Sequence, residues 1–253
     1  MLPDVAGLES PAFLMVCATI ALAGLTRGFA GFGAAMIYMP IASAIMDPKL
    51  AAASLLLVDA TISLPMVVSA TKICDWRTVL PAAGGAVITV SIGAWVLTNA
   101  DPYLLRWVLS CVVLTLLAVL VSGWRYTKAP NKRTSFGVGA VSGLLGGMTQ
   151  LAGPPVITYW MSGPLPVSVI RANLITYFFF TSFGSFAAFW WNGLITQELL
   201  LLSLLICPAY GLSIYLGAKG FSKSSGKSYR LLAYTLILGA AITSMPILDG
   251  ILR

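Results

Sequence analysis

The sequence predicts an all-α polytopic membrane protein built from two inverted repeats, each a broken or re-entrant helical hairpin followed by three transmembrane helices. The first observation behind this is composition, since 58% of the residues are hydrophobic, 9% are charged and histidine is absent, as is typical of integral membrane proteins. The second is that glycines interrupt two long apolar segments. The third is that the pattern of the first of these segments recurs 119 positions later.

Most of the apolar segments have the length of about 20 residues that crosses a bilayer. Two are too long for one crossing, because the 35 residues of the first would extend roughly 50 Å as a straight helix, whereas the hydrocarbon core is about 30 Å thick. These two are also rich in glycine, so we expect each to break at its glycines. In chain order we expect a hairpin at 12–46, spans at 50–71, 78–98 and 103–124, a second hairpin at 134–162, and spans at 168–191, 196–217 and 231–248.

The two halves of the chain match as copies of one unit. The matches hold at an offset of 119 through the hairpin and the following span, and at an offset of 124 beyond it. They pair Gly24 with Gly143, Gly28 with Gly147, Ser54 with Asn173, Gly93 with Gly217 and Arg106 with Arg230. We therefore expect a first repeat at 1–128 and a second at 129–253, joined near residue 130.

Lys and Arg set the expected orientation, because they are enriched in cytoplasmic loops. The strongly basic loops at 125–133 and 219–230 are both cytoplasmic if each hairpin enters and leaves the membrane on one face. Ten basic residues then lie inside and three outside, whereas eight single crossings remove the bias. The second repeat is then inverted relative to the first, and the N-terminus is extracytoplasmic. Inverted repeats with broken helices near the bilayer midplane are a transporter architecture.

The two glycine-rich stretches carry a family resemblance. They read G-L-T-R-G-F-A-G-F-G-A-A-M-I-Y-M-P from Gly24 and G-G-M-T-Q-L-A-G-P-P-V from Gly146, and each precedes a short loop and an Ala-rich or I-R-A-N span. Together they resemble the sulfite exporter TauE/SafE family over nearly the whole chain. The resemblance implies a transporter of the bacterial inner membrane that exports sulfite, sulfoacetate or related organosulfonates.

Arg27 is the sharpest candidate for binding an anion, because an arginine inside a membrane segment is costly unless it faces a cavity or a partner. The alternative is a structural ion pair with Asp59, the one carboxylate deep in a predicted span. Asp59 could instead carry a coupling proton, since burial raises the pKa of a carboxylate toward the range where it titrates.

The two breaks supply further candidates for substrate binding. Glycine lets the backbone approach a ligand closely, Thr149 and Gln150 offer hydroxyl and amide donors, and prolines suit the start of a returning half-helix whose amides favour an anion. The alternative is that these residues form a tight hairpin tip. The candidates at the breaks are Gly28, Gly31 and Gly33 in the first copy and Thr149, Gln150, Gly153 and Pro154 in the second.

Three polar residues in the spans have both a structural and a functional interpretation. Ser54 and Asn173 occupy equivalent positions and either face one cavity or form interhelical hydrogen bonds. Arg171 either snorkels toward the interface or captures an anion at the cytoplasmic entry. The aromatic run that begins at Tyr177 and the Trp190-Trp191 pair are expected to face lipid or the interface.

Composition also limits the function classes. The net charge of +7 resides in short loops, which argues against nucleic acid, and the absence of histidine and of paired carboxylates disfavours an enzyme. Scattered cysteines predict neither a disulfide nor a metal site, and we expect no cofactor. The expected partners are a small anionic substrate, membrane lipid and, as an open alternative to a monomer, a second copy of the chain. A passive anion channel, or a transporter of thiosulfate or sulfate, remains the alternative function.

Overall fold

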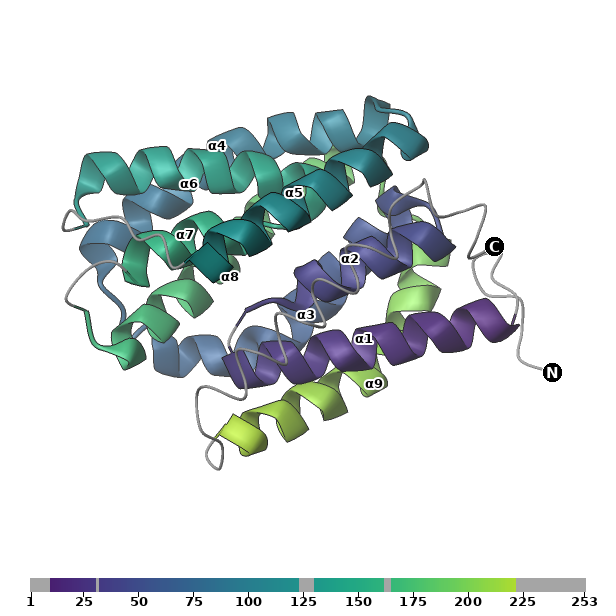
Figure 1. The fold of residues 1–253 in the computed structure, drawn as a ribbon, viewed down its shortest axis with the longest axis horizontal. Helices are drawn as coiled ribbons and strands as arrows, with labels where there is room; N and C mark the ends of the chain where they lie inside the picture. The colour runs from purple at the N-terminus through teal and green to yellow at the C-terminus, as the bar shows by residue number, and fades with distance from the viewer. Residues whose placement is uncertain (1–9, 31, 123–129, 162–164, 222–253) are drawn as a thin grey trace. The chain divides into compact units, whose positions relative to one another are not determined.

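The structure is a computed structural model that describes residues 10–30, 32–122, 130–161 and 165–221 of the 253-residue chain. Throughout these residues the regular structure is α-helical (Figure 1). The helices are α1 Ser10–Ala30, α2 Ala34–Ile45, α3 Pro48–Ala70, α4 Trp76–Asn99, α5 Pro102–Ser122, α6 Lys132–Thr149, α7 Gly153–Met161, α8 Val167–Trp191 and α9 Gln197–Phe221. The predicted span at 231–248 lies outside the described residues.

Short polar residues begin several of these helices. The carboxylate of Asp101 accepts the backbone N–H groups of Tyr103 and Leu104 at the start of α5. The side chain of Asn131 accepts the N–H of Thr134 at the start of α6. Such caps satisfy amides that have no partner within the helix, so α5 and α6 each start where a capping side chain is available.

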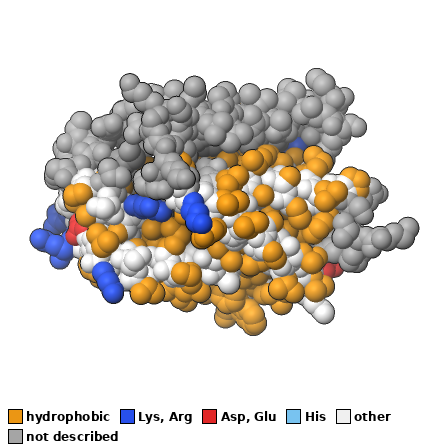
Figure 2. Space-filling model, turned by 90° about the horizontal axis from the view of Figure 1, so that it is seen from below, with side chains coloured by type: hydrophobic (Ala, Val, Ile, Leu, Met, Phe, Trp, Pro, Cys, Tyr) orange, Lys and Arg blue, Asp and Glu red, His pale blue; other side chains and the backbone are white. Residues whose placement is uncertain are grey.

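Among the described residues, five helices are long and apolar enough to cross a membrane: Pro11–Phe29, Pro48–Ala70, Trp76–Asn99, Ser168–Trp191 and Gln197–Lys219. The prediction of an all-helical chain with membrane-spanning segments is confirmed for this part of the protein. Large apolar side chains such as Val68, Ile88 and Leu204 are exposed on these helices, and on the face that Figure 2 shows, hydrophobic side chains make up a large part of the described surface. These side chains are suited to contact lipid.

Both segments that are too long for one crossing are broken in two. The segment 12–46 becomes α1 and α2, which pack on each other, with α2 turning back along α1 (Figure 1). The segment 134–162 becomes α6 and α7, which are also in contact. At about 1.5 Å per residue, α1 is about 31 Å long and α7 only about 14 Å. The returning helix α7 is therefore shorter than a membrane crossing.

The described helices gather into two compact units, and each unit takes helices from both halves of the sequence. Unit 1 holds α1, α2, the first half of α3, most of α5, and α9. Unit 2 holds the second half of α3, together with α4, α6, α7 and α8. The boundary between sequence repeats near residue 130 stays a prediction.

In unit 1, glycines bring α1 and α9 into close contact. A Cβ atom on Gly24 would lie 2.9 Å from the carbonyl oxygen of Tyr210. One on Gly28 would overlap the backbone of Ile214, and one on Gly217 would overlap the backbone of Leu25. Small residues that let two backbones approach are a general feature of helix pairs in membranes.

In unit 2, α4 and α6 pack through glycines in the same way, and the equivalent positions are involved. Every contact between α1 and α9 given above has a counterpart between α6 and α4, displaced by 119 residues on one helix and 124 on the other. The contact of Gly24 with Tyr210 corresponds to that of Gly143 with Ala86. The contact of Gly28 with Ile214 corresponds to that of Gly147 with Val90, and the contact of Gly217 with Leu25 to that of Gly93 with Leu144. Offsets found in the sequence thus correspond to one packing arrangement that is used once in each unit.

We predict that Gly85→Ala destabilises the protein and that the neighbouring substitution Gly84→Ala does not. A Cβ on Gly85 would overlap the carbonyl oxygen of Phe136 in α6, whereas one on Gly84 would meet nothing within 4 Å. Overpacking of this kind costs about 1–3 kcal/mol, and alanine is otherwise the better helix former. Thermal unfolding of the detergent-solubilised protein, followed by tryptophan fluorescence, measures both. Equal melting temperatures for the two variants would contradict the close α4–α6 packing.

Candidate functional site

The break between α6 and α7 forms a compact tip that its own side chains hold together. Gln150 adopts a left-handed conformation with φ 60°, and its backbone N–H and side-chain amide both donate to the carbonyl of Gly146. Thr149 is fully buried and donates its hydroxyl to Leu145 O at 2.7 Å. The hydroxyl proton that we expected Thr149 to offer to a substrate is therefore donated within α6, to a carbonyl one turn earlier.

A chain of buried hydroxyl groups ties this tip to α8. Tyr177 Oη donates to Ser142 Oγ at 2.8 Å, and Ser142 Oγ donates in turn to the carbonyl of Ala152 in the tip. The expectation that Tyr177 faces lipid or the interface is wrong, because its side chain is 0% exposed. The phenol has a polar group that needs a partner, and the tip provides it. By contrast, Trp190 and Trp191 are exposed.

The helix α7 begins at Gly153, so the predicted pair of prolines occupies its first turn. Proline is favoured at such positions because the first amides of a helix have no partner within it. A Cβ on Gly153 would lie 3.3 Å from Ile157 Cδ1 and 3.5 Å from Phe178 Cζ. The space beside Gly153 therefore has room for little more than a methyl group.

Asp75, at the start of α4, connects three helices. Its backbone N–H donates to Asn173 Oδ1 in α8 at 2.7 Å, and its carboxylate oxygen Oδ2 accepts the hydroxyl of Thr78 at 2.9 Å. Thr78 Oγ1 in turn accepts the indole N–H of Trp160 in α7 at 3.2 Å. Sequence reasoning missed Asp75, Thr78 and Trp160. The spacing of Asp75 and Thr78 in D-W-R-T signals a helix cap, but no local pattern shows that Asn173 and Trp160 join it.

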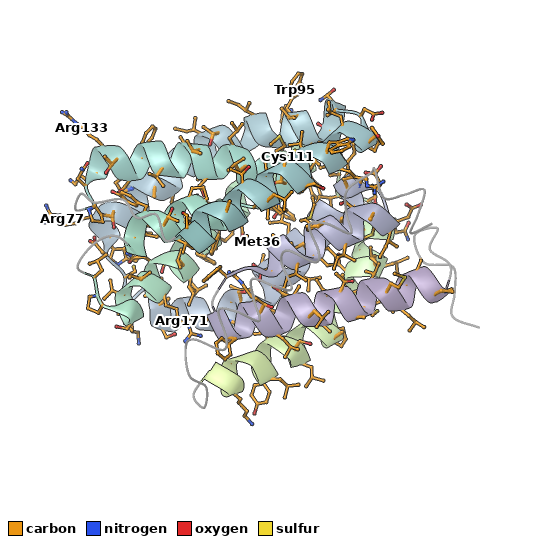
Figure 3. All side chains as sticks on the ribbon, viewed as in Figure 1. Met36, Arg77, Trp95, Cys111, Arg133 and Arg171 are labelled. Carbon is orange, nitrogen blue, oxygen red and sulfur yellow. The ribbon has the colours of Figure 1, made fainter. Side chains whose placement is uncertain are left out.

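One end of unit 2 carries basic side chains. Both α4 and α6 start at this end, because residues early in α4 contact residues early in α6, as Gly85 does Phe136. Figure 3 shows Arg77 and Arg133 extending outward there. Asn173 bonds to the start of α4, which brings the first turns of α8, with the half-buried Arg171, to the same end.

In unit 1 the break between α1 and α2 includes Gly33, which has φ 97° and precedes α2. Glycine suits this position because a side chain is strained at positive φ. Gly31 lies outside the described residues. Gly28 is buried against α9, where a Cβ would overlap Ile214, so close helix packing accounts for this glycine. Its predicted role in binding a substrate stays a prediction.

Arg27 is 7% exposed and lies in the last turn of α1. A cation at this position is favoured by the negative end of the helix dipole. Asp59 is half-buried in α3 and accepts the hydroxyl of Ser63 at 3.2 Å. Arg27 belongs to unit 1 and Asp59 to unit 2, so the predicted ion pair between them stays a prediction.

The predicted site residues thus divide between the two units. Unit 2 brings the α6–α7 tip and Asn173 into one set of helices, α4, α6, α7 and α8. In unit 1, Ser54 donates to Ala51 O and shares a hydrogen bond with Tyr38 Oη, both at 3.0 Å.

The described residues contain no group of three His, Cys, Asp or Glu side chains that could hold a metal ion, and the four cysteines are all free.

Comparison with known proteins decides the family. The sequence model of the sulfite exporter TauE/SafE family matches residues 16–244. The chain belongs to the sulfite exporter TauE/SafE family. It is also 28% identical over 224 residues to a probable sulfite/organosulfonate exporter TauE of Cupriavidus necator, which covers 85% of this chain and 86% of that relative. No solved structure matches the TauE/SafE chain described here.

We predict that Tyr177→Phe lowers the melting temperature and slows transport. The substitution removes the hydroxyl that donates to Ser142 and leaves the buried Ser142 oxygen with one partner fewer, which costs about 1 kcal/mol. Because the series of hydrogen bonds runs from Tyr177 through Ser142 to the carbonyl of Ala152, the tip loses its link to α8. The exposed Tyr103, at 57%, provides the matched control Tyr103→Phe, for which we expect no change. Identical melting curves for the wild type and Tyr177→Phe would show that the hydroxyl chain does not hold the tip.

Proposed function

We propose that this TauE/SafE protein is a secondary transporter that exports small sulfur-containing anions, such as sulfite, sulfoacetate and related organosulfonates, across the bacterial inner membrane. The observation that carries the proposal is the family match over residues 16–244. The Cupriavidus necator relative is named a probable sulfite/organosulfonate exporter, which supports this substrate class. Within the described ranges, five apolar helices of spanning length support the location in a membrane.

The proposal includes two inverted repeats whose broken helices enclose the substrate. It is supported by the equivalent glycine contacts of α1 with α9 and of α6 with α4. It is also supported by the breaks at equivalent places in the two long segments. In this arrangement the N-terminus is extracytoplasmic and the loops at 125–133 and 219–230 are cytoplasmic. The basic end of unit 2 (Figure 3) supports a shared cytoplasmic face for Arg77 and Arg133.

Arg27 is the main source of attraction for the anion in this proposal. It is almost completely buried in an apolar helix, and a buried arginine in a membrane protein marks a functional path by default. Gly33 in one unit and the α6–α7 tip in the other, with Gln150, Gly153 and Pro154, are the breaks that this proposal assigns to substrate binding. The membrane potential favours export, because a monovalent anion leaving a cell that is negative inside gains about 2.3 kcal/mol per 100 mV.

Flux from proteoliposomes tests the proposed function. Vesicles are loaded with radiolabelled sulfite, sulfoacetate, thiosulfate or sulfate, and efflux is measured with and without a potential or a pH gradient. We expect saturable efflux of sulfite and sulfoacetate that rises when the interior is negative. Labelling of a single cysteine placed in 125–133 reports the orientation of the protein in the vesicles. Efflux that does not saturate would indicate a passive channel, and movement of sulfate or thiosulfate alone would overturn the substrate class.

We predict that Arg27→Ala raises the half-saturating anion concentration, whereas Arg27→Lys keeps part of the activity. Lysine retains the charge but lacks the planar fork of donors. Asp59→Asn distinguishes two roles of the carboxylate: a variant that transports without responding to a pH gradient indicates proton coupling, and one that folds or binds poorly indicates a structural partner for Arg27. Wild-type flux and pH response in all three variants would exclude both residues from the mechanism.

A further inference from the structure

Asn173 in α8 is held in one orientation by the backbone of the turn between α3 and α4. The side chain is 0% exposed, and its Oδ1 accepts the N–H of Asp75 at 2.7 Å. A backbone N–H can only donate, so the oxygen of the amide must face Asp75. The amide nitrogen Nδ2 is thereby directed away from this contact, which settles which end of the amide is available to another group.

The Nδ2 atom of Asn173 is buried and has no hydrogen-bond partner within the described part of the chain. Most buried polar side-chain atoms are hydrogen-bonded, so each exception calls for a specific explanation. Nδ2 carries two N–H groups and accepts nothing, which means that only a group with lone pairs satisfies it. The oxygens of a sulfite or sulfonate anion are such groups.

A second polar atom lies one helical turn further along the same face of α8. Residues three apart on a helix are neighbours, and Thr176 follows Asn173 by three positions. Its side chain is 0% exposed, and its hydroxyl has no hydrogen-bond partner at normal geometry among the described residues, although it interacts with the Cys74 thiol. The two residues thus present an amide donor and a hydroxyl close together in a buried place.

The equivalent position in the first repeat is arranged differently. Ser54 corresponds to Asn173 at the offset of 119, and it is also 0% exposed. Its hydroxyl donates to Ala51 O and is hydrogen-bonded to Tyr38 Oη, which links α2 to α3. Ser54 therefore has the hydrogen-bond partners that Nδ2 of Asn173 lacks, and it forms an interhelical hydrogen bond.

The carboxylate of Asp75 is the charge that would oppose an anion at this place. Its two oxygens accept the backbone N–H of Arg77 and the hydroxyl of Thr78, so the carboxylate caps the amino end of α4. The positive end of that helix dipole stabilises the charge there, and the Arg77 side chain follows two residues later. The negative charge of Asp75 is consequently directed to α4, while its backbone N–H is directed to Asn173.

We propose that Nδ2 of Asn173, assisted by the hydroxyl of Thr176, donates to an oxygen of the transported sulfur oxyanion, with Asp75 as the positioning residue. The site is unequal between the repeats, because Ser54 serves only the packing of α2 and α3. This inference rests on the proposed transport of a small sulfur-containing anion. Because Asn173 is fully buried, the anion reaches it only after the surrounding helices move, as alternating access requires.

Asn173→Asp separates a substrate donor from a structural acceptor. Aspartate has nearly the same shape and keeps an oxygen that accepts the Asp75 N–H, but it replaces the amide donors with an oxygen. We expect the half-saturating concentration for radiolabelled sulfite and sulfoacetate to rise at least tenfold, with the maximal rate less affected. Asn173→Ser is the second variant, since its hydroxyl is too short to replace the amide donor, and we expect the same rise. Thr176→Val should give a smaller rise.

Ser54→Ala is the matched control, because it removes the polar group at the equivalent position of the first repeat. We expect it to lower the melting temperature in detergent and to leave the half-saturating concentration unchanged. Wild-type half-saturation in both Asn173→Asp and Asn173→Ser, at normal protein levels, would overturn the inference. If the wild type transports thiosulfate or sulfate in place of sulfite and sulfoacetate, the substrate class is wrong. The Asn173 variants are then judged on the anion that does move.

Discussion

The lack of water in a bilayer constrains the whole structure, because every backbone N–H and C=O at membrane depth needs a partner within the protein. A continuous helix meets this requirement by itself, but the two breaks do not. At the second break, Gln150 and Thr149 bond back to the last turn of α6, and Ser142 reaches the carbonyl of Ala152. The N–H of Gln150, the hydroxyl of Thr149 and the carbonyl of Ala152 therefore have partners within the protein, which favours a non-helical tip in apolar surroundings.

Satisfied breaks alone do not hold helices together, and packing supplies the rest. In lipid the hydrophobic effect gives little reason for one apolar helix to associate with another, so close approach and dispersion carry more weight. Gly28 and Gly217 provide this approach for α1 and α9, and Gly147 and Gly93 do so for α6 and α4. Many glycines that would weaken a helix in water are here the residues through which helices touch. Their number is then an expected consequence of the environment.

The sequence predicted the parts of the fold that depend on local pattern. The spans at 50–71, 78–98, 168–191 and 196–217 correspond closely to α3, α4, α8 and α9, because twenty apolar residues in a row have few alternatives to a membrane helix. The offset of 119 residues identified equivalent glycines, but it could not tell which helices they join. That pairing is between helices far apart in the sequence. The burial of Tyr177 was missed for the same reason, since its partner Ser142 is 35 positions away.

Close packing and substrate binding favour different residues at equivalent positions of the two halves, as Ser54 and Asn173 illustrate. A repeated unit starts with equal residues at equivalent sites, and packing favours keeping them similar, as at Gly24 and Gly143. A bound anion needs its own set of donors, and donors that are already used in packing cannot serve it. Ser54 has given its hydroxyl to the contact between α2 and α3, whereas Asn173 uses only its oxygen for the contact with α4. A longer side chain with both an acceptor and a donor can hold the helices and still offer a group to the substrate. If the two halves are repeats and Asn173 binds the anion as we propose, asymmetry at such positions, more than the shared glycines, is where the transporter acquires its specificity.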